Sequence, residues 1–128
     1  MATQWRSVST SEPAWLTSNN RMVCPVAVAR TRSARRRGLI GLESIDGALW
    51  ITKCRCVHTF GMAFPIDVAF IDRANRIVAM QTIGPNRISA FHRSSTAVVE
   101  SYAGSMRDWG LSIGDLLALA PDQSSPVR

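Results

Sequence analysis

Three side chains that can bind a metal or act in catalysis stand at alternate positions in the middle of the chain. Cys54, Cys56 and His58 are each separated by one residue, so on an extended strand all three would point to one face. Two thiolates and an imidazole could hold zinc. A fourth ligand would come from Cys24, His92 or Asp67. Compact metal sites use loop spacings such as C-x2-C, whereas neighbours on one strand face are about 6 to 7 Å apart, so we expect no metal and no other cofactor.

The same segment offers a second chemistry, nucleophilic catalysis. Cys56, His58 and Asp67 could form a catalytic triad, but no nucleophile elbow, oxyanion-hole motif or second acid–base pair accompanies them in the sequence. Free cysteines most often pack as small buried hydrophobes. A hydrolase that uses these three residues is therefore an alternative, and the leading interpretation is noncatalytic.

Polar residues at both ends of the segment His58–Asp67 suggest a ligand site. Their side chains can bond to backbone groups and so fix the path of the chain through Gly61 and Pro65. They could also line a small pocket that offers one cation, one imidazole and two carboxylates to a polar ligand. Both interpretations stay open. The ligand-binding residues that the sequence predicts are Arg37, His58, Thr59, Asp67 and Glu100.

The chain is basic, with a net charge of +6, and Lys53 is its only lysine among 15 basic residues. The arginines are scattered, and a coding bias of the genome would explain them without a function. Arg35 to Arg37 could contact phosphate, which makes weak electrostatic binding of nucleic acid a third interpretation. The four tryptophans are dispersed, so we expect no aromatic array for stacking bases and no main role in nucleic-acid binding.

Mostly strands are expected to position these residues. Alternating apolar and β-branched runs, with Gly, Pro, Asn and Asp between them, indicate the element boundaries. The expected elements are a hairpin of 14–17 and 22–24 that turns at 18–21, a strand at 26–29, a helix from Thr31 or Ser33 to Leu39, a strand at 48–51, a hairpin of 66–71 and 76–81, a loop at 84–95, a strand at 96–102, a helical turn within 104–110 and a last strand at 116–119.

These elements predict a mainly β (α+β) fold, a compact strand-rich sheet or small barrel of about seven strands with one short helix packed against it. We expect a flexible leader at 1–12, a single globular domain at 13–120 and a flexible tail at 121–128. No apolar stretch approaches the roughly 20 residues of a membrane span. The N-terminus lacks a secretory signal and the three cysteines cannot all pair, so we expect a soluble cytoplasmic protein.

Several motifs, in this order, resemble those of the family called the domain of unknown function 192. They are RGLIG at 37–41, HTFGMAFPID at 58–67, Ile71-Asp72, Glu100 with Gly104, and Gly114-Asp115. The resemblance runs from about Trp15 to Leu119. It implies a compact, mainly β fold and no established reaction. The cysteine pair before His58 is not part of the family motif, so it gains no role from the resemblance.

The sequence thus favours a noncatalytic module that binds a small polar ligand or a protein partner, as a monomer or a homodimer. The alternatives are the hydrolase with Cys56, His58 and Asp67, and the weak nucleic-acid binder. A catalytic Cys56 would have a lowered pKa and would react fast with alkylating reagents, which a buried thiol would not.

Overall fold

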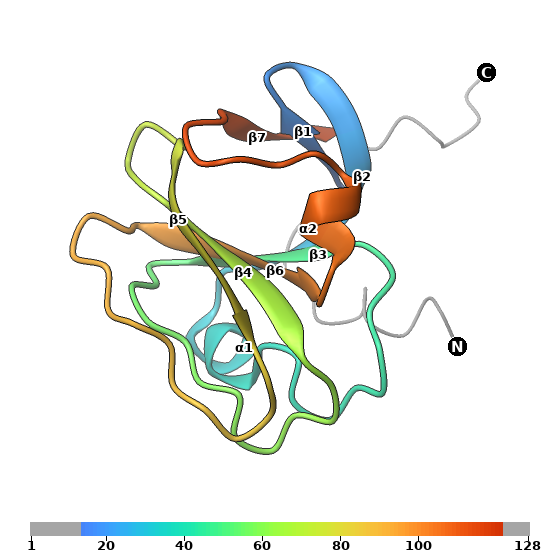
Figure 1. Ribbon diagram of the computed structural model, residues 1–128, viewed down its shortest axis with the longest axis vertical. Helices are drawn as coiled ribbons and strands as arrows, with labels where there is room; N and C mark the ends of the chain where they lie inside the picture. Colours follow the sequence, from blue (N-terminus) through green and yellow to red (C-terminus); the bar gives the residue numbers. More distant parts are fainter. Residues whose placement is uncertain (1–13, 122–128) are drawn as a thin grey trace.

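The structure is a computed structural model that describes residues 14–121. Seven strands form one sheet, and two short helices lie in the connections (Figure 1). The elements are β1 (Ala14–Ser18), β2 (Arg21–Ala29), α1 (Arg32–Arg37), β3 (Ala48–Thr52), β4 (Ile66–Ile71), β5 (Ile77–Ile83), β6 (Ala97–Tyr102), α2 (Ser105–Asp108) and β7 (Leu117–Pro121). The predicted mainly β fold is confirmed.

The sheet has the strand order β5-β4-β6-β3-β2-β1-β7. β2 and β3 run parallel and are joined through α1, while every other neighbouring pair is antiparallel. β6 therefore lies between β3 and β4, although it follows both in the sequence. Figure 1 shows β1, β2 and β7 grouped at one end of the molecule and α1 among long connections at the other.

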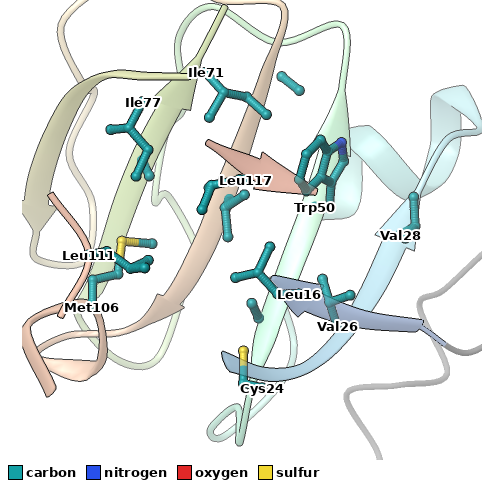
Figure 2. Packing of buried hydrophobic residues seen from close by; sticks show 14 of the residues in the cluster. Leu16, Cys24, Val26, Val28, Trp50, Ile71, Ile77, Met106, Leu111 and Leu117 are labelled. Carbon is teal, nitrogen blue, oxygen red and sulfur yellow. The ribbon is translucent and has the colours of Figure 1, made fainter. Parts of the chain in front are cut away.

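The strands have two apolar faces, because successive side chains on a strand point to opposite sides. On β4, Val68 and Phe70 belong to a first core with Leu39 and Met62, while Ala69 and Ile71 belong to a second core. Figure 2 shows side chains from several strands of the sheet converging in the second core; they include Leu16, Val26, Ile71 and Leu117. The same alternation decides on which face each polar strand residue lies.

β2 is one continuous strand, whereas the sequence suggested two pieces separated by Pro25. Pro25 lies opposite Trp15 of β1, and β2 begins to pair with β3 only at Val26. Proline can occupy a strand where its missing N–H is not needed by a partner. The predicted turn at 18–21 is also confirmed, since Asn19 and Asn20 have φ values of 52° and 68°.

Helix α1 begins as the sequence predicts and ends two residues earlier. The Thr31 hydroxyl accepts a hydrogen bond from the Ala34 N–H at 3.1 Å, which caps the N-terminus. The chain leaves the helix at Gly38, whose φ is 51°, and Leu39 turns into the first core. α2 occupies the predicted turn, and Gly104 precedes it with a φ of 95°.

The predicted leader at 1–12 lies outside the described residues, as does the predicted tail apart from Pro121, which ends β7. Between residues 14 and 121, no helix is long and apolar enough to cross a membrane.

Candidate functional site

A small pocket of about 130 Å³ lies between α1, the segment that follows β3, and β6. We call it the α1 pocket. It is lined by Arg35, Arg36, Arg37, Gly38, Leu39, Ile40, Ile51, Cys54, Cys56, Val57, His58, Met62 and Glu100. Three of the five predicted ligand residues, Arg37, His58 and Glu100, are thus brought together, while Thr59 and Asp67 are not.

Glu100 supplies the buried carboxyl group of the pocket. Its backbone pairs with Leu49 on β3 and with Val68 on β4, so it stands in the middle of the sheet on the first-core face. The side chain is 3% exposed, and its Oε1 has no hydrogen-bond partner. Burial raises the pKa of this carboxyl group to about 7, because a charge is costly to remove from water. An unpaired buried carboxyl oxygen is rare in folded proteins.

Gly38 lies next to this carboxyl group. A Cβ atom at position 38 would lie 3.7 Å from Glu100 Oε1, an ordinary contact distance, but the φ of 51° would strain any residue with a side chain. The glycine after Arg37 therefore ends α1 and brings the backbone close to the carboxyl oxygen of Glu100.

The arginines of α1 differ in exposure. Arg36 and Arg37 are exposed, as expected, but Arg35 is half-buried and its Nε has no hydrogen-bond partner. The possible phosphate contact of Arg35 predicted from the sequence would need an exposed side chain. The spacing of four residues between Arg35 and the buried Leu39 could have indicated the inward direction, because residues four apart share one side of a helix.

The two cysteines do not continue a regular strand. β3 ends at Thr52, and Lys53 has a φ of 56°, so the alternation expected for Cys54, Cys56 and His58 is broken. Cys54 is half-buried and its Sγ donates to the Cys56 carbonyl at 3.3 Å. Burial raises the pKa of the Cys54 thiol to about 11. The neighbouring charge of Glu100 adds to this rise.

Cys56 and His58 lie at the exposed side of the pocket. Cys56 is exposed and accepts a hydrogen bond from the Ser89 hydroxyl at 3.7 Å, so it is not the buried hydrophobe that was expected. His58 is exposed, its Nδ1 accepts from the Phe60 N–H at 3.3 Å, and its ring stacks on that of Phe60. Phe60 is 48% exposed, whereas Met62 and Phe64 in the same segment are buried.

The residues considered as a fourth metal ligand lie elsewhere. Cys24 is buried in the second core, and the ring of His92 packs on Phe70 with 4.3 Å between centroids. Within residues 14–121, no group of three or more His, Cys, Asp or Glu side chains is arranged to hold a metal ion.

Asp67 lies on the opposite face of the sheet from Glu100. Its Oδ1 accepts from the Thr82 hydroxyl at 2.6 Å, and its Oδ2 accepts from the N–H groups of Gly104 at 2.9 Å and Met106 at 3.2 Å. It lines a larger cavity of about 410 Å³ beside β5 and α2. Oδ2 thus holds the start of α2 and Oδ1 is bonded to β5, so the triad with Cys56 and His58 is not assembled.

Thr59 is fully buried and holds the connection between β5 and β6. Its Oγ1 donates to the Gly84 carbonyl at 2.6 Å and accepts from the Arg87 N–H at 2.9 Å. The structural interpretation of Thr59, which the sequence left open, is the one that the contacts support.

Residues 14–119 match the family model of the domain of unknown function 192, described as "Uncharacterized ACR". The chain belongs to this DUF192 family. The pieces of the family motif have distinct places in the structure: RGLIG and Glu100 form the pocket, while Asp67 and Gly114-Asp115 hold segments together. The suspected resemblance is confirmed.

A curated relative is the UPF0127 protein TK1120 of Thermococcus kodakarensis, 26% identical over 113 residues that cover 80% of this chain and 72% of the relative. A solved structure from Sinorhizobium meliloti 1021, described as a "putative transcription regulator", has a TM-score of 0.72 and 24% identity over 87% of this chain and 95% of that one. A protein of unknown function from Novosphingobium aromaticivorans has a TM-score of 0.69 and 17% identity, covering 83% of both chains. These solved structures show that the fold is shared.

Proposed function

We propose that this DUF192 protein is a noncatalytic module that binds a small polar ligand in the α1 pocket. The observation that carries the proposal is Glu100, a buried residue that lines the pocket and whose Oε1 has no hydrogen-bond partner. Burying such a group without a hydrogen bond is unfavourable by about 1 to 3 kcal/mol. A ligand that donates a hydrogen bond to Oε1 would recover part of this free energy.

The size of the pocket supports a small ligand. Pockets for drug-sized molecules measure roughly 300 to 1,000 Å³, and the α1 pocket measures about 130 Å³. The larger cavity beside α2 is a weaker candidate, because the carboxylate of Asp67 there is already saturated by three donors. A ligand of a few non-hydrogen atoms fits the α1 pocket.

The chemistry of the pocket residues favours binding over catalysis. The raised pKa of Cys54 keeps its thiol protonated at neutral pH, and a protonated thiol is a poor nucleophile. His58 Nδ1 already accepts an N–H from its own loop, and Asp67, the third member of the predicted triad, is engaged with α2.

Ligand binding can be tested with isotope-labelled protein and a panel of small amines, carboxylic acids, amides and amino acids. Binders should shift the amide resonances of residues 35–40, 51–58 and 100. Ile40→Trp places a bulky ring at the pocket and should weaken each such binder at least tenfold. Ile113→Trp, at a position that is 66% exposed and outside the pocket, is the matched control.

The proposal would be overturned if no compound binds at millimolar concentration. It would equally fail if all binders shift residues 80–82 and 106–112, at the larger cavity, or bind the Ile40→Trp variant as well as they bind the wild type.

A second candidate function is electrostatic binding of nucleic acid. Arg32 and Arg36 line one shallow hollow with Lys53, and Lys53 also lines the next hollow with Arg55. Arg35 lines the first hollow as well, so five cations lie on adjoining parts of one surface. The Sinorhizobium meliloti structure is described as a "putative transcription regulator". Basic residues that neutralise phosphates release counterions, so the affinity of such binding falls as the salt concentration rises.

Fluorescence anisotropy with a labelled DNA duplex at several salt concentrations tests this function. Reversing the charges of Arg36 and Lys53 to Glu should abolish binding, whereas reversing Arg73, on the exposed β4–β5 turn, should have a smaller effect. Equal losses for both variants would show binding through net charge alone.

A further inference from the structure

We propose that the ligand of the α1 pocket is a small zwitterion, which presents an ammonium group to Glu100 and a carboxylate or similar anion to Arg35. This inference rests on the proposed function, because it assigns the ligand class of the same pocket. It starts from two buried polar atoms without hydrogen-bond partners, one an acceptor and the other a donor.

The two atoms are Oε1 of Glu100, an acceptor, and Nε of Arg35, a donor. Both are buried, neither has a hydrogen-bond partner, and both residues line the one pocket. Buried polar groups in native structures are nearly always paired with protein, water or ligand. One molecule that carries both a donor and an acceptor would satisfy both atoms at once, through charge-assisted hydrogen bonds.

The charges around the pocket favour a ligand with both signs. Arg36 and Arg37 are exposed at the same pocket, while the only carboxyl group among its lining residues is the buried Glu100. A simple anion would be attracted by the arginines but repelled by Glu100. A simple cation would be attracted by Glu100 but repelled by the arginines. A zwitterion matches the cations with its anionic end and Glu100 with its ammonium end.

An ammonium partner would change the ionisation of Glu100. With its pKa raised by burial to about 7, the carboxyl group is only partly ionised at neutral pH, and an adjacent ammonium would hold it in the ionised form. The other titratable side chains that line the pocket are the three arginines of α1, Cys54, Cys56 and His58.

The apolar part of the lining limits the ligand further. Leu39, Ile51 and Met62 surround the polar groups, and about 130 Å³ leaves no room for a long side chain. Glycine, alanine and β-alanine are zwitterions of suitable size. They are probes of the class, and each has a matched molecule with only one of its charges.

The experiment is calorimetric titration of the whole protein with glycine and β-alanine, compared with methylammonium and acetate. We expect at least one zwitterion to bind tenfold or more tightly than either singly charged probe. Glu100→Gln and Arg35→Gln should each weaken that zwitterion at least tenfold, and Arg73→Gln, on an exposed turn, should not change its affinity. Amide spectra establish that each variant is folded.

A second readout needs no variant. Binding that requires ionised Glu100 should strengthen roughly tenfold from pH 6 to pH 8, because a group with a pKa of about 7 is mostly protonated at the lower pH. The rise should disappear in Glu100→Gln.

Failure of this inference differs from failure of the proposed function. If methylammonium or acetate binds as tightly as the zwitterions, or another compound of the panel binds the α1 pocket and is blocked by Ile40→Trp, the ligand class is wrong and the binding function stands. If nothing binds the pocket, both are wrong.

Discussion

At the scale of single residues, Glu100 occupies a position where an apolar side chain would pack better. It stands on β6 two residues after Val98, on the first-core face, and its neighbours across the sheet are Leu49 and Val68. The ionised form is destabilised by desolvation, and no hydrogen bond to Oε1 offsets this penalty. A polar residue that lowers stability in this way is typical of a functional site.

The pKa of Glu100 predicts how stability depends on pH. Burial raises it from the ordinary value of 4.5 to about 7, so between these values the folded protein binds more protons than the unfolded chain. Stability must therefore fall as pH rises through this range. The shift corresponds to roughly 3 kcal/mol.

Glu100→Gln should remove this loss, since glutamine cannot ionise. We expect the variant to exceed the wild type in free energy of unfolding by roughly 3 kcal/mol at pH 8 and to match it near pH 4. Urea denaturation at both pH values measures the difference. Glu43→Gln, at an exposed position, serves as control; an equal change there would trace the effect to net charge.

The three cysteines should react in a fixed order with iodoacetamide at pH 7.5. Cys56 is exposed and should react first. Cys54 should follow slowly, because a pKa near 11 in place of 9.0 lowers its thiolate fraction about 100-fold. Cys24, buried in the second core with a pKa near 12, should react only after unfolding.

Mass spectrometry with peptide mapping measures this order. If Cys54 reacts as fast as Cys56, its thiol is ionised in the folded protein, and nucleophilic chemistry in the α1 pocket has to be reconsidered.

At the scale of elements, strand alternation separates two carboxyl groups that the sequence analysis assigned to one site. Asp67 is paired with Ser101 across β4 and β6, while Glu100 is paired with Val68. Neighbouring positions along a strand face opposite sides. Asp67 therefore holds α2 on one face, and Glu100 lines the α1 pocket on the other.

Asp67→Ala should destabilise the protein without removing the ligand site. The variant lacks the hydrogen bonds from Thr82, Gly104 and Met106. We expect its free energy of unfolding to fall by about 3 kcal/mol, because three hydrogen bonds to a carboxylate are lost. Thr82→Val, which loses one of them, should cost about 1 kcal/mol. Chemical denaturation compares these variants with Asp108→Ala, at an exposed position on α2.

In folded Asp67→Ala protein, probes of the α1 pocket should bind with unchanged affinity. A loss of binding that exceeds the unfolded fraction would show that Asp67 belongs to the ligand site after all.

At the scale of the whole molecule, the turn before β7 joins segments that are far apart in the sequence. Asp115 accepts from the Ser112 N–H at 2.9 Å and from the Asn19 amide at 3.2 Å, and its carbonyl accepts from the Ile77 N–H at 3.0 Å. Arg76 donates to the Gly114 carbonyl at 2.9 Å. One turn thus links the β1–β2 hairpin to the β4–β5 hairpin, near the two edges of the sheet.

Asp115→Ala should therefore loosen both hairpins. The loss of the hydrogen bonds to the carboxylate should lower the free energy of unfolding by about 2 kcal/mol. Amide hydrogen exchange should become faster at residues 18–19 and 111–117. Asp46→Ala, an exposed acidic position in the α1–β3 connection, should change neither quantity. An effect of Asp115→Ala confined to its own turn would contradict the linking role.

The sequence by itself determined the elements of this protein and its family. The strands follow from apolar and β-branched runs, and their turns from Asn19, Asn20 and Asn75, which adopt positive φ values. These are local preferences, set by each residue and its neighbours in the chain. The sequence also predicted that Arg37, His58 and Glu100 line one site, since each of them lies in a distinctive motif.

Only the tertiary structure decided what these residues contact. β6 inserts between β3 and β4, and this non-local pairing places Glu100 beside Gly38 and Cys54 while Asp67 turns to α2. The exposure of Cys56 depends in the same way on segments distant in the sequence. Local patterns fix backbone conformation, whereas the partners of a side chain depend on the order in which strands join the sheet.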